Sequence, residues 1–389
     1  MNQLLLTLLL IITLSSCKKS GNGNTNPDEI KKFYKTSEFV MGADLSYVNQ
    51  ILDHGGIYKD SGNVADPYHI FQKNGANVIR FRLFHNPTWT KDVYGTSGTQ
   101  MYNDFADVKK GISKAKEAGM GVCLDFHYSD TWADPSKQKK PAAWESLSSI
   151  LVLQDSIYNY TYKVINTLGQ NGLMPEYVQV GNEINPGLLL PQGNRWSGNE
   201  VNMISLLISG IKAVRDASAS SSVKPKIIIH IAQPENVDAW FNGLAAKGLI
   251  DYDIIGISYY YLWSTVSLTD VSNYISLVKT NYKKEVMIME TAYPWTSGNS
   301  DSYGNTFNSS KLLPEYPATA EGQYNYLRAL TQEIIDGGGK GIFYWEPAWI
   351  TSNMKDLWGT GSSWDNHTLF DFQGEILKGM HFMTYQYKF

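Results

Sequence analysis

Cysteine and net charge are both scarce in this sequence, and each shortage excludes a class of protein. The 389 residues include two cysteines, Cys17 and Cys123, and carry a formal net charge of −4. Two cysteines cannot supply a disulfide framework or a cysteine metal site. Because positive charge is not in excess, we expect no nucleic-acid partner. Cys123 lies within an apolar segment, where we expect an inert core residue.

Signatures of phosphate-handling and metal-dependent enzymes are also missing. There is no glycine-rich phosphate loop late in the chain and no histidine cluster with metal-ligand spacing. There is no short-period repeat and no change of composition that would mark a second domain. A chain of this length then fits one large barrel or α/β domain, and nothing in it requires more than a monomer.

The N-terminus predicts a processing signal followed by a tether. Leu4–Leu14 is apolar but too short to span a bilayer, as in the central part of a signal peptide. It ends in Leu14-Ser15-Ser16-Cys17, and small residues before a cysteine resemble a bacterial lipobox, in which the cysteine is acylated. We therefore expect residues 1–16 to be a lipoprotein signal peptide, with the lipid on Cys17. Residues 17–34 are polar and rich in glycine and asparagine, which predicts a flexible tether.

This reading places the protein in a bacterial cell envelope, at the outer membrane. The lipid anchor would be its only contact with the membrane. The alternative is a plain secretory signal in which Cys17 is unmodified. The sequence leaves open which face of the membrane the anchor occupies.

The remaining residues, 35–389, alternate short apolar segments with amphipathic ones. Helical spacing of apolar residues predicts helices at Phe105–Ala118, Val201–Ala217 and Gln323–Ile335. Strands that are apolar on both faces and alternate with helices predict an α/β fold, a single (β/α)8 TIM barrel. The eight expected strands are Phe39–Leu45, Val78–Phe84, Gly121–Phe126, Tyr177–Val180, Lys226–Ile231, Ile254–Tyr259, Val286–Met289 and Gly341–Trp345.

Polar or aromatic residues follow nearly every expected strand. In such a barrel the chemistry lies where strands end and the next loops begin. Ionisable groups are costly to bury unless paired, so their repeated occurrence at one end favours a functional cleft. The residues concerned are Asp44, Arg80, Arg82, His85, Asp125, His127, Asp130, Asn182, Glu183, His230, Gln233, Tyr259, Tyr260, Glu290, Trp345 and Glu346.

Two carboxylates stand out among them, Glu183 after the fourth strand and Glu290 after the seventh. Glycoside hydrolysis with retention uses two carboxyl groups about 5–5.5 Å apart, one as acid/base and one as nucleophile, whereas inversion separates them by roughly 6.5–9.5 Å. The sequence does not give this distance. We expect Arg80 or Arg82 to keep Glu290 ionised, and burial to raise the pKa of Glu183. Asn182 is placed to bond the sugar 2-hydroxyl.

An ordered set of segments carries a family resemblance. They are Gly42-Ala43-Asp44-Leu45-Ser46, Arg80-Phe81-Arg82, Leu124-Asp125-Phe126-His127-Tyr128-Ser129-Asp130, Gln179-Val180-Gly181-Asn182-Glu183, Ser258-Tyr259-Tyr260, Glu290-Thr291-Ala292-Tyr293, Tyr344-Trp345-Glu346-Pro347-Ala348-Trp349 and Leu369-Phe370-Asp371. Asn182-Glu183 with a glutamate after the seventh strand resembles clan A of the glycoside hydrolases, and the full set resembles family 53. The resemblance covers about residues 35–389.

The resemblance implies endo-acting, retaining hydrolysis of β-1,4-galactan, the side chain of type I arabinogalactan and pectin. Glu183 would be the acid/base and Glu290 the nucleophile, with no organic cofactor. Trp89, Trp132 and Trp349 would stack on further galactose units. The residues implied around the cleaved galactose are Asp44, Arg80, His127, Asn182, His230, Tyr259 and Trp345.

A second part of the resemblance concerns calcium. The segment from Asn299 to Asn305 places oxygen-bearing residues at alternate positions, and Ca²⁺ takes six to eight oxygen ligands. Bacterial members of the family are similar here, which implies a structural calcium ion. Its expected ligands are Asn299, Asp301, the backbone carbonyl of Tyr303, Asn305, Ser362 and Asp365. The alternative is a polar loop without metal.

Two other functions remain open. Clan A enzymes share the catalytic pair, so a β-mannanase, xylanase or cellulase would differ only in the surrounding residues. A surface lipoprotein that binds glycan without cleaving it would be expected to lack one carboxylate, whereas Glu183 and Glu290 are both present.

Overall fold

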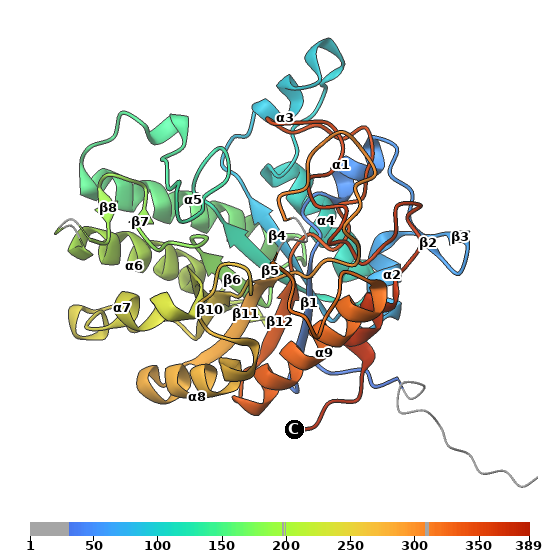
Figure 1. The fold of residues 1–389 in the computed structure, drawn as a ribbon. Helices are drawn as coiled ribbons and strands as arrows, with labels where there is room; N and C mark the ends of the chain where they lie inside the picture. Colours follow the sequence, from blue (N-terminus) through green and yellow to red (C-terminus); the bar gives the residue numbers. More distant parts are fainter. Residues whose placement is uncertain (1–30, 197, 199, 308–310) are drawn as a thin grey trace, which may run out of the picture.

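The computed structural model describes residues 31–196, 198, 200–307 and 311–389, and its centre is a closed barrel of parallel strands (Figure 1). The strands follow one another around the barrel in the order β1-β12-β11-β10-β9-β6-β5-β4. All eight segments expected to be strands form it, so the predicted (β/α)8 fold is confirmed. The barrel strands are β1 (Val40–Asp44), β4 (Val78–Leu83), β5 (Gly121–Phe126), β6 (Tyr177–Val180), β9 (Lys226–Ala232), β10 (Ile254–Ser258), β11 (Glu285–Thr291) and β12 (Gly341–Tyr344).

Helices surround the barrel, and Figure 1 shows α5, α6, α8 and α9 on its outside. The three helices expected from apolar spacing are present as α4, α6 and α9. The Asp104 side chain caps α4 by accepting from the backbone N–H of Asp107 at 2.9 Å, and α4 buries Val108, Ile112 and Ala115. The helices are α1 (Val48–Asp53), α2 (Pro67–Lys73), α3 (Trp89–Asp92), α4 (Phe105–Glu117), α5 (Ile150–Gln170), α6 (Glu200–Ala217), α7 (Val237–Phe241), α8 (Val271–Tyr282) and α9 (Ala320–Asp336).

Shorter elements decorate the loops. A two-stranded ribbon of β2 (Lys59–Asp60) and β3 (Asn63–Val64) follows α1, and a second one of β7 (Gly187–Leu188) and β8 (Gly193–Asn194) follows β6. After β12, a 3₁₀ segment over Lys378–Thr384 packs on α9.

The barrel interior has an apolar floor and a polar upper layer. The floor contains Cys123, fully buried, which confirms that it is a core residue. Because side chains alternate along a strand, residues two or four positions further on face the same interior, nearer its carboxyl end. The floor is Val40, Val78, Cys123, Tyr177, Ile228, Ile254, Met287, Met289 and Phe343, and the polar layer above it is Asp44, Arg80, Asp125, Gln179, His230 and Ser258.

The chain joins the barrel earlier than the sequence suggested. Tyr34, expected in the tether, is 5% exposed, and its hydroxyl donates to the carbonyl of Tyr385 at 2.7 Å. The same hydroxyl accepts from the backbone N–H of Tyr387, so the last part of the expected tether is docked on the C-terminal segment. The expected signal peptide and Cys17 lie outside the described residues. Over the part of the chain that the structure describes, no helix is long and apolar enough to cross a membrane.

Candidate active site

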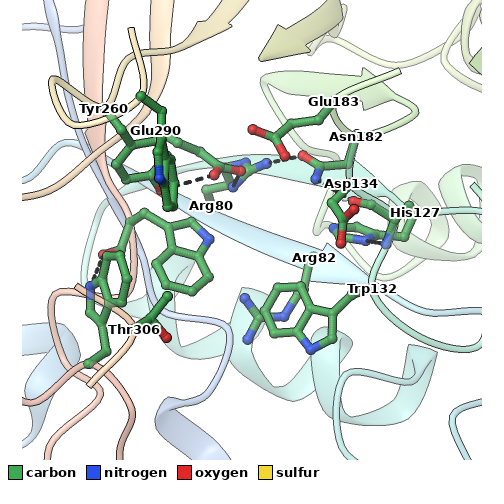
Figure 2. Close-up of a pocket in the computed structure, with 14 residues that line it drawn as sticks. Arg80, Arg82, His127, Trp132, Asp134, Asn182, Glu183, Tyr260, Glu290 and Thr306 are labelled. Atoms are coloured by element: carbon green, nitrogen blue, oxygen red, sulfur yellow. Dashed lines mark hydrogen bonds and ion pairs between the residues drawn. The ribbon is translucent and has the colours of Figure 1, made fainter. Parts of the chain in front are cut away.

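A cleft opens above the polar layer, at the carboxyl ends of the strands (Figure 2). Both predicted catalytic glutamates line it, together with arginine, histidine and four tryptophans. The lining residues are Arg80, Arg82, His127, Trp132, Ala133, Asp134, Asn182, Glu183, Tyr260, Trp263, Glu290, Thr306, Trp345 and Trp364.

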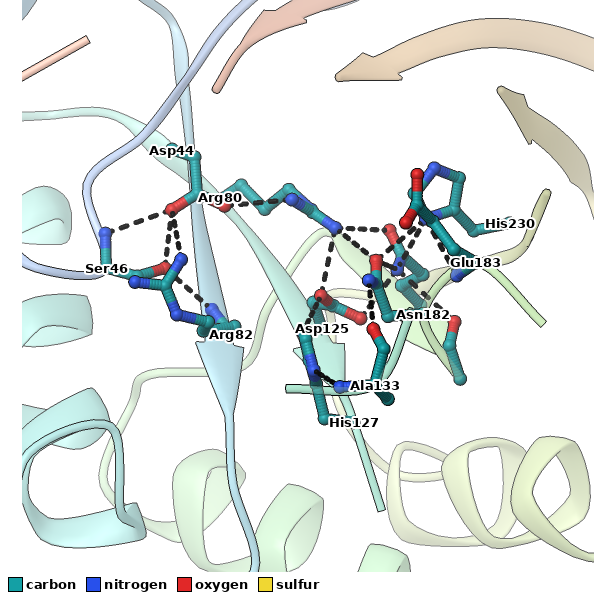
Figure 3. Close-up of polar contacts among 12 residues, drawn as sticks. Asp44, Ser46, Arg80, Arg82, Asp125, His127, Ala133, Asn182, Glu183 and His230 are labelled. Carbon is teal, nitrogen blue, oxygen red and sulfur yellow. Dashed lines mark hydrogen bonds and ion pairs between the residues drawn. The ribbon is translucent and has the colours of Figure 1, made fainter. Parts of the chain in front are cut away.

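Arg80 lies at the centre of the polar layer and is 1% exposed (Figure 3). Its Nη1 lies 2.9 Å from Oδ2 of Asp44 and 3.0 Å from Oε1 of Glu290. Its Nη2 lies 2.9 Å from Oδ2 of Asp125 and donates to Oδ1 of Asn182 at 2.8 Å. The planar guanidinium thus orients groups from four strand ends with one charge. Of the two arginines considered from the sequence, the structure selects Arg80 as the partner of Glu290.

Glu290 enters the cleft because β11 is irregular. In the pairing of β10 with β11, Ile257 is opposite Ile288, but Ser258 is opposite Glu290, so Met289 is skipped. Met289 belongs to the apolar floor, and strict alternation would turn the next side chain outward. The extra residue of this bulge lets Glu290 also face inward.

The environment of Glu290 balances burial against positive charge. Burial raises the pKa of Glu290 to about 7, and the Arg80 guanidinium opposes that rise. The hydroxyl of Tyr260 donates to Oε2 at 3.1 Å and also favours the ionised form. An ionised carboxylate held by two donors is suited to attack an electrophilic carbon.

Glu183 is in the opposite electrostatic situation. Burial and then the charge of Glu290 raise its pKa well above the usual range, while a hydrogen bond from Ser258 opposes them. Ser258 Oγ lies 2.6 Å from Oε1. Glu183 also has a positive φ of 42°, a strained conformation that is found at functional sites. Since Glu290 is the carboxyl with the arginine, the first proton leaves Glu290 and Glu183 stays protonated.

His127 and Asn182 are oriented by a loop that folds over them. Nδ1 of His127 accepts from the backbone N–H of Ala133 at 2.9 Å, so Nε2 carries the proton and donates to Asp125 at 3.0 Å. Nδ2 of Asn182 donates to the carbonyl of Ala133 at 2.8 Å, and Gln138 donates to its backbone carbonyl. These bonds fix the orientation of both side chains.

Aromatic rings form the walls of the cleft. Trp345 and Trp364 pack edge to face with centroids 4.6 Å apart. On the other side, the Arg82 guanidinium lies 4.1 Å from the ring centres of both Tyr47 and Trp132. Flat apolar surfaces of this kind suit the faces of sugar rings.

The predicted substrate-binding residues separate into three groups. Five of them line the cleft, namely Arg80, His127, Trp132, Asn182 and Trp345. Asp44 and His230 are fully buried beneath it, where Asp44 pairs with Arg80 and His230 contacts Asn182 and Ser258. Tyr259, Trp89 and Trp349 are not among the residues that line the cleft, and their part in substrate binding stays a prediction.

The polar atoms of these three side chains have partners in the protein. The hydroxyl of Tyr259 donates to the carbonyl of Val266 at 3.1 Å. The indole N–H of Trp89 donates to the carbonyl of Asp130. Trp349 is 3% exposed and donates to the carbonyl of Gly361.

Tyr260 was expected at a strand end, but three other contributors to the cleft or its support were not singled out, namely Ser258, Trp263 and Trp364. Side-chain alternation predicts that Ser258 faces inward, because it is four residues after Ile254 of the apolar floor. No sequence signal marks the two tryptophans, which lie in long loops. Trp263 is 52% exposed and packs on Phe307 with centroids 4.6 Å apart, as an exposed platform at the rim.

The expected calcium ligands gather in the loops after β11 and β12. Oγ1 of Thr351 lies 2.7 Å from Oδ2 of Asp301 and 3.2 Å from Oδ2 of Asp365, so these two carboxylates converge. Nδ2 of Asn305 donates to Asp365 at 2.9 Å, and Oδ1 of Asn305 is buried without a partner. The other three expected ligands are engaged elsewhere: Asn299 donates to the carbonyl of Tyr303, and the hydroxyl of Ser362 donates to Trp349.

Comparisons with known proteins point to one family. The chain is 44% identical over 335 residues to the arabinogalactan endo-β-1,4-galactanase of Cellvibrio japonicus, a match that covers 86% of each chain. It is 32% identical over 387 residues to the endo-β-1,4-galactanase of Bacillus subtilis, covering 90% of this chain and 86% of that one. The solved structure of the GH53 catalytic domain of Ignisphaera aggregans superposes with a TM-score of 0.82 at 34% identity, covering 92% and 99% of the two chains. The profile of glycosyl hydrolase family 53 matches residues 40–383, and the chain therefore belongs to this family of glycoside hydrolases.

Proposed function

We propose that this protein is an endo-acting, retaining β-1,4-galactanase that cleaves galactan and type I arabinogalactan into galacto-oligosaccharides. The observation that carries the proposal is the pair of carboxyl groups in one cleft with opposed surroundings, Glu290 beside Arg80 and Glu183 beside Ser258. The two relatives named above, both described as endo-β-1,4-galactanases, support the choice of galactan.

In the first step Glu290 attacks the anomeric carbon while Glu183 gives its proton to the leaving oxygen. Attack requires an ionised Glu290, which Arg80 and Tyr260 favour. Proton donation requires a protonated Glu183, which burial favours. A covalent galactosyl–enzyme results, and the leaving part of the polysaccharide departs with the proton.

In the second step Glu183 acts as a base, because Glu290 has lost its negative charge. Glu290 is now an ester and carries no charge, so the neighbouring repulsion that raised the pKa of Glu183 is gone. Glu183 is left ionised and takes a proton from a water molecule, which attacks the anomeric carbon. The bond to Glu290 breaks, and the configuration of the sugar is retained.

The substrate is tested with the soluble domain and a panel of galactan, mannan, xylan and cellulose. We expect galactan to be cleaved into short oligosaccharides and the other glycans to remain intact. Cleavage of mannan or xylan instead would keep the catalytic pair and discard the galactan preference. Absence of any cleavage, with retained galactan binding, would favour the glycan-binding lipoprotein.

We also propose a structural calcium ion between the loops after β11 and β12. The residues that fit it best are Asp301, Asp365 and Asn305, whose buried Oδ1 lacks a partner. Burial, and also the charge of Asp301, raise the pKa of Asp365, and a cation would relieve both costs. Among the described residues no group of three or more His, Cys, Asp or Glu could hold a metal, so amide and carbonyl oxygens would complete the shell, as calcium permits. The ion would tie the two loops together.

Finally, we propose that the mature protein is a monomer held in a bacterial cell envelope, at the outer membrane, by lipid on Cys17. The support is the apolar segment Leu4–Leu14 followed by Ser15-Ser16-Cys17. An anchored barrel on a polar tether could work on insoluble or surface-bound polysaccharide while staying with the cell.

A further inference from the structure

A buried chain of hydrogen bonds lies behind the acid/base glutamate. Ser258 Oγ lies 2.6 Å from Oε1 of Glu183 and 2.9 Å from Nε2 of His230. Ser258 and His230 are both 0% exposed, and neither is among the residues that line the cleft. Figure 3 shows His230 directly beside Glu183. These two side chains therefore act on Glu183 without touching substrate.

We propose that Ser258, oriented by His230, is a positioning residue that holds Oε1 of Glu183 as a hydrogen-bond acceptor and reserves Oε2 for proton exchange. Oε2 then gives its proton to the glycosidic oxygen in the first step and takes one from water in the second. This proposal deepens the hydrolytic mechanism given above and rests on it.

The orientation of the chain follows from counting protons. A serine hydroxyl has one proton, and if it goes to Glu183, Ser258 can meet His230 only as an acceptor. Nε2 of His230 then carries the imidazole proton and Nδ1 is bare. Two donors face Nδ1, the side-chain amide of Gln179 at 3.0 Å and the backbone N–H of Glu183 at 3.4 Å.

The opposite tautomer has one contact in its favour. Oδ1 of Asn182 lies 2.9 Å from Nδ1 of His230 and would accept a proton there. That oxygen, however, already accepts from Arg80 at 2.8 Å. The opposite tautomer would also turn the Ser258 hydroxyl toward His230 and away from Glu183, so the two arrangements are distinguishable.

The hydrogen bond also tunes proton affinity. Donation to a carboxylate favours its ionised form, so Ser258 lowers the pKa of Glu183 against the effect of burial. An acid whose pKa is too high would release its proton too reluctantly to the leaving oxygen. His230 stays neutral, because burial and then Arg80 lower its pKa well below the usual range. The ionisable groups that face Glu183 are Glu290, Asp134, Arg80 and Tyr260, and those that face His230 are Arg80, Asp125 and His127.

The first test is the pH profile of kcat/KM for Ser258→Ala. Activity disappears on the alkaline side when Glu183 loses its proton. Removing the donor raises the pKa of Glu183, so we expect this alkaline limb to move upward by roughly one pH unit. Ser258→Thr keeps the hydroxyl and should restore the wild-type limb. Ser218→Ala is the matched control: Ser218 directly follows α6, is 3% exposed, and its hydroxyl donates to the carbonyl of Val214 at 2.8 Å.

An alkaline limb that stays in place in Ser258→Ala would overturn the proposal, whatever happens to the rate. The profile can be read on whichever β-glycan the enzyme cleaves, so an error in the galactan assignment would not obscure it. A second measurement uses the wild-type protein without substrate. The ¹⁵N chemical shifts of the His230 ring can be assigned by their loss in His230→Gln. At a pH above the alkaline limb, where Glu183 is ionised, they should show the imidazole proton on Nε2. A proton on Nδ1 there would also overturn the proposal.

Discussion

The hydroxyl of Tyr260 donates a hydrogen bond to Glu290, whereas the hydroxyl of its neighbour Tyr259 donates to the backbone carbonyl of Val266. The donor–acceptor distance is 3.1 Å in both bonds. The two tyrosines thus form a matched pair for mutation. Tyr260→Phe removes a donor to the nucleophile, which at about 1.5–3 kcal/mol corresponds to roughly a 10- to 100-fold loss of kcat/KM. Tyr259→Phe should leave kcat/KM near wild type and cost about 1 kcal/mol of stability. Equal loss of activity in both variants would contradict this placement.

The roles of the two glutamates can be distinguished by changing the leaving group of the substrate. Glu183→Ala should slow galactan hydrolysis by about 10²- to 10⁴-fold, the usual contribution of a general acid. With an activated aryl β-galactoside the first step needs no proton, so a burst of aryl alcohol should persist. Glu290→Ala should abolish turnover of both substrates while galactan still binds. Stopped-flow release of the aryl group and affinity electrophoresis on galactan measure the two effects. A burst in Glu290→Ala would reverse the assignment.

The acid limb of the pH profile belongs to Glu290, which must be ionised to attack. Arg80 lowers the pKa of this carboxyl, so weakening that contact raises the pKa. As the pH falls, the variant should therefore lose activity earlier than the wild type, and its acid limb should lie at a higher pH. Arg80→Lys keeps a charge but loses the planar fork, and kcat/KM against pH measures the shift. Arg82→Lys is the control, since Arg82 pairs with Glu346 at 2.6 Å instead. It should leave the acid limb in place even where KM rises.

Removal of calcium should lower the melting temperature and spare the chemistry. An ion present at about 100 times its Kd stabilises the fold by about 2.7 kcal/mol, so chelator should reduce the Tm of the wild type by several degrees. Asp301→Asn should have the lower Tm already and respond little to chelator. Asp371→Asn, in another loop where Asp371 accepts from backbone N–H groups, should still respond as the wild type does. A wild-type Tm that is indifferent to both calcium and chelator would contradict the site.

The two cysteines provide a controlled test of anchoring. Cys17→Ala should release the protein from the membrane fraction, because the acylated side chain is lost. Cys123→Ala changes the same residue type in the barrel floor and should leave the protein membrane-bound. Immunoblots of fractionated cells measure both. Membrane association of Cys17→Ala equal to wild type would refute the lipid anchor.

Much of the architecture could be predicted because each barrel strand has a recognisable local sequence pattern. Segments such as Ile254–Ser258 are short, apolar and β-branched, since both faces of a parallel strand are buried. Glu183 and Glu290 could be predicted because each directly follows such a segment, and the carboxyl ends of all strands meet at one end of the barrel. The docking of Tyr34 on Tyr385 and Tyr387 was missed, because the contact joins residues about 350 positions apart.

The sequence by itself determined the fold and the family and predicted a catalytic pair, since these depend on the order and local pattern of residues along the chain. Only the tertiary structure decided which neighbours serve that pair. The bulge that turns Glu290 inward, the choice of Arg80 over Arg82 and of Tyr260 over Tyr259, and the burial of Trp349 all depend on strand register and loop packing. A shift of one residue in register reverses the direction of a side chain. Such shifts are set by contacts across the barrel, between residues that are distant in sequence.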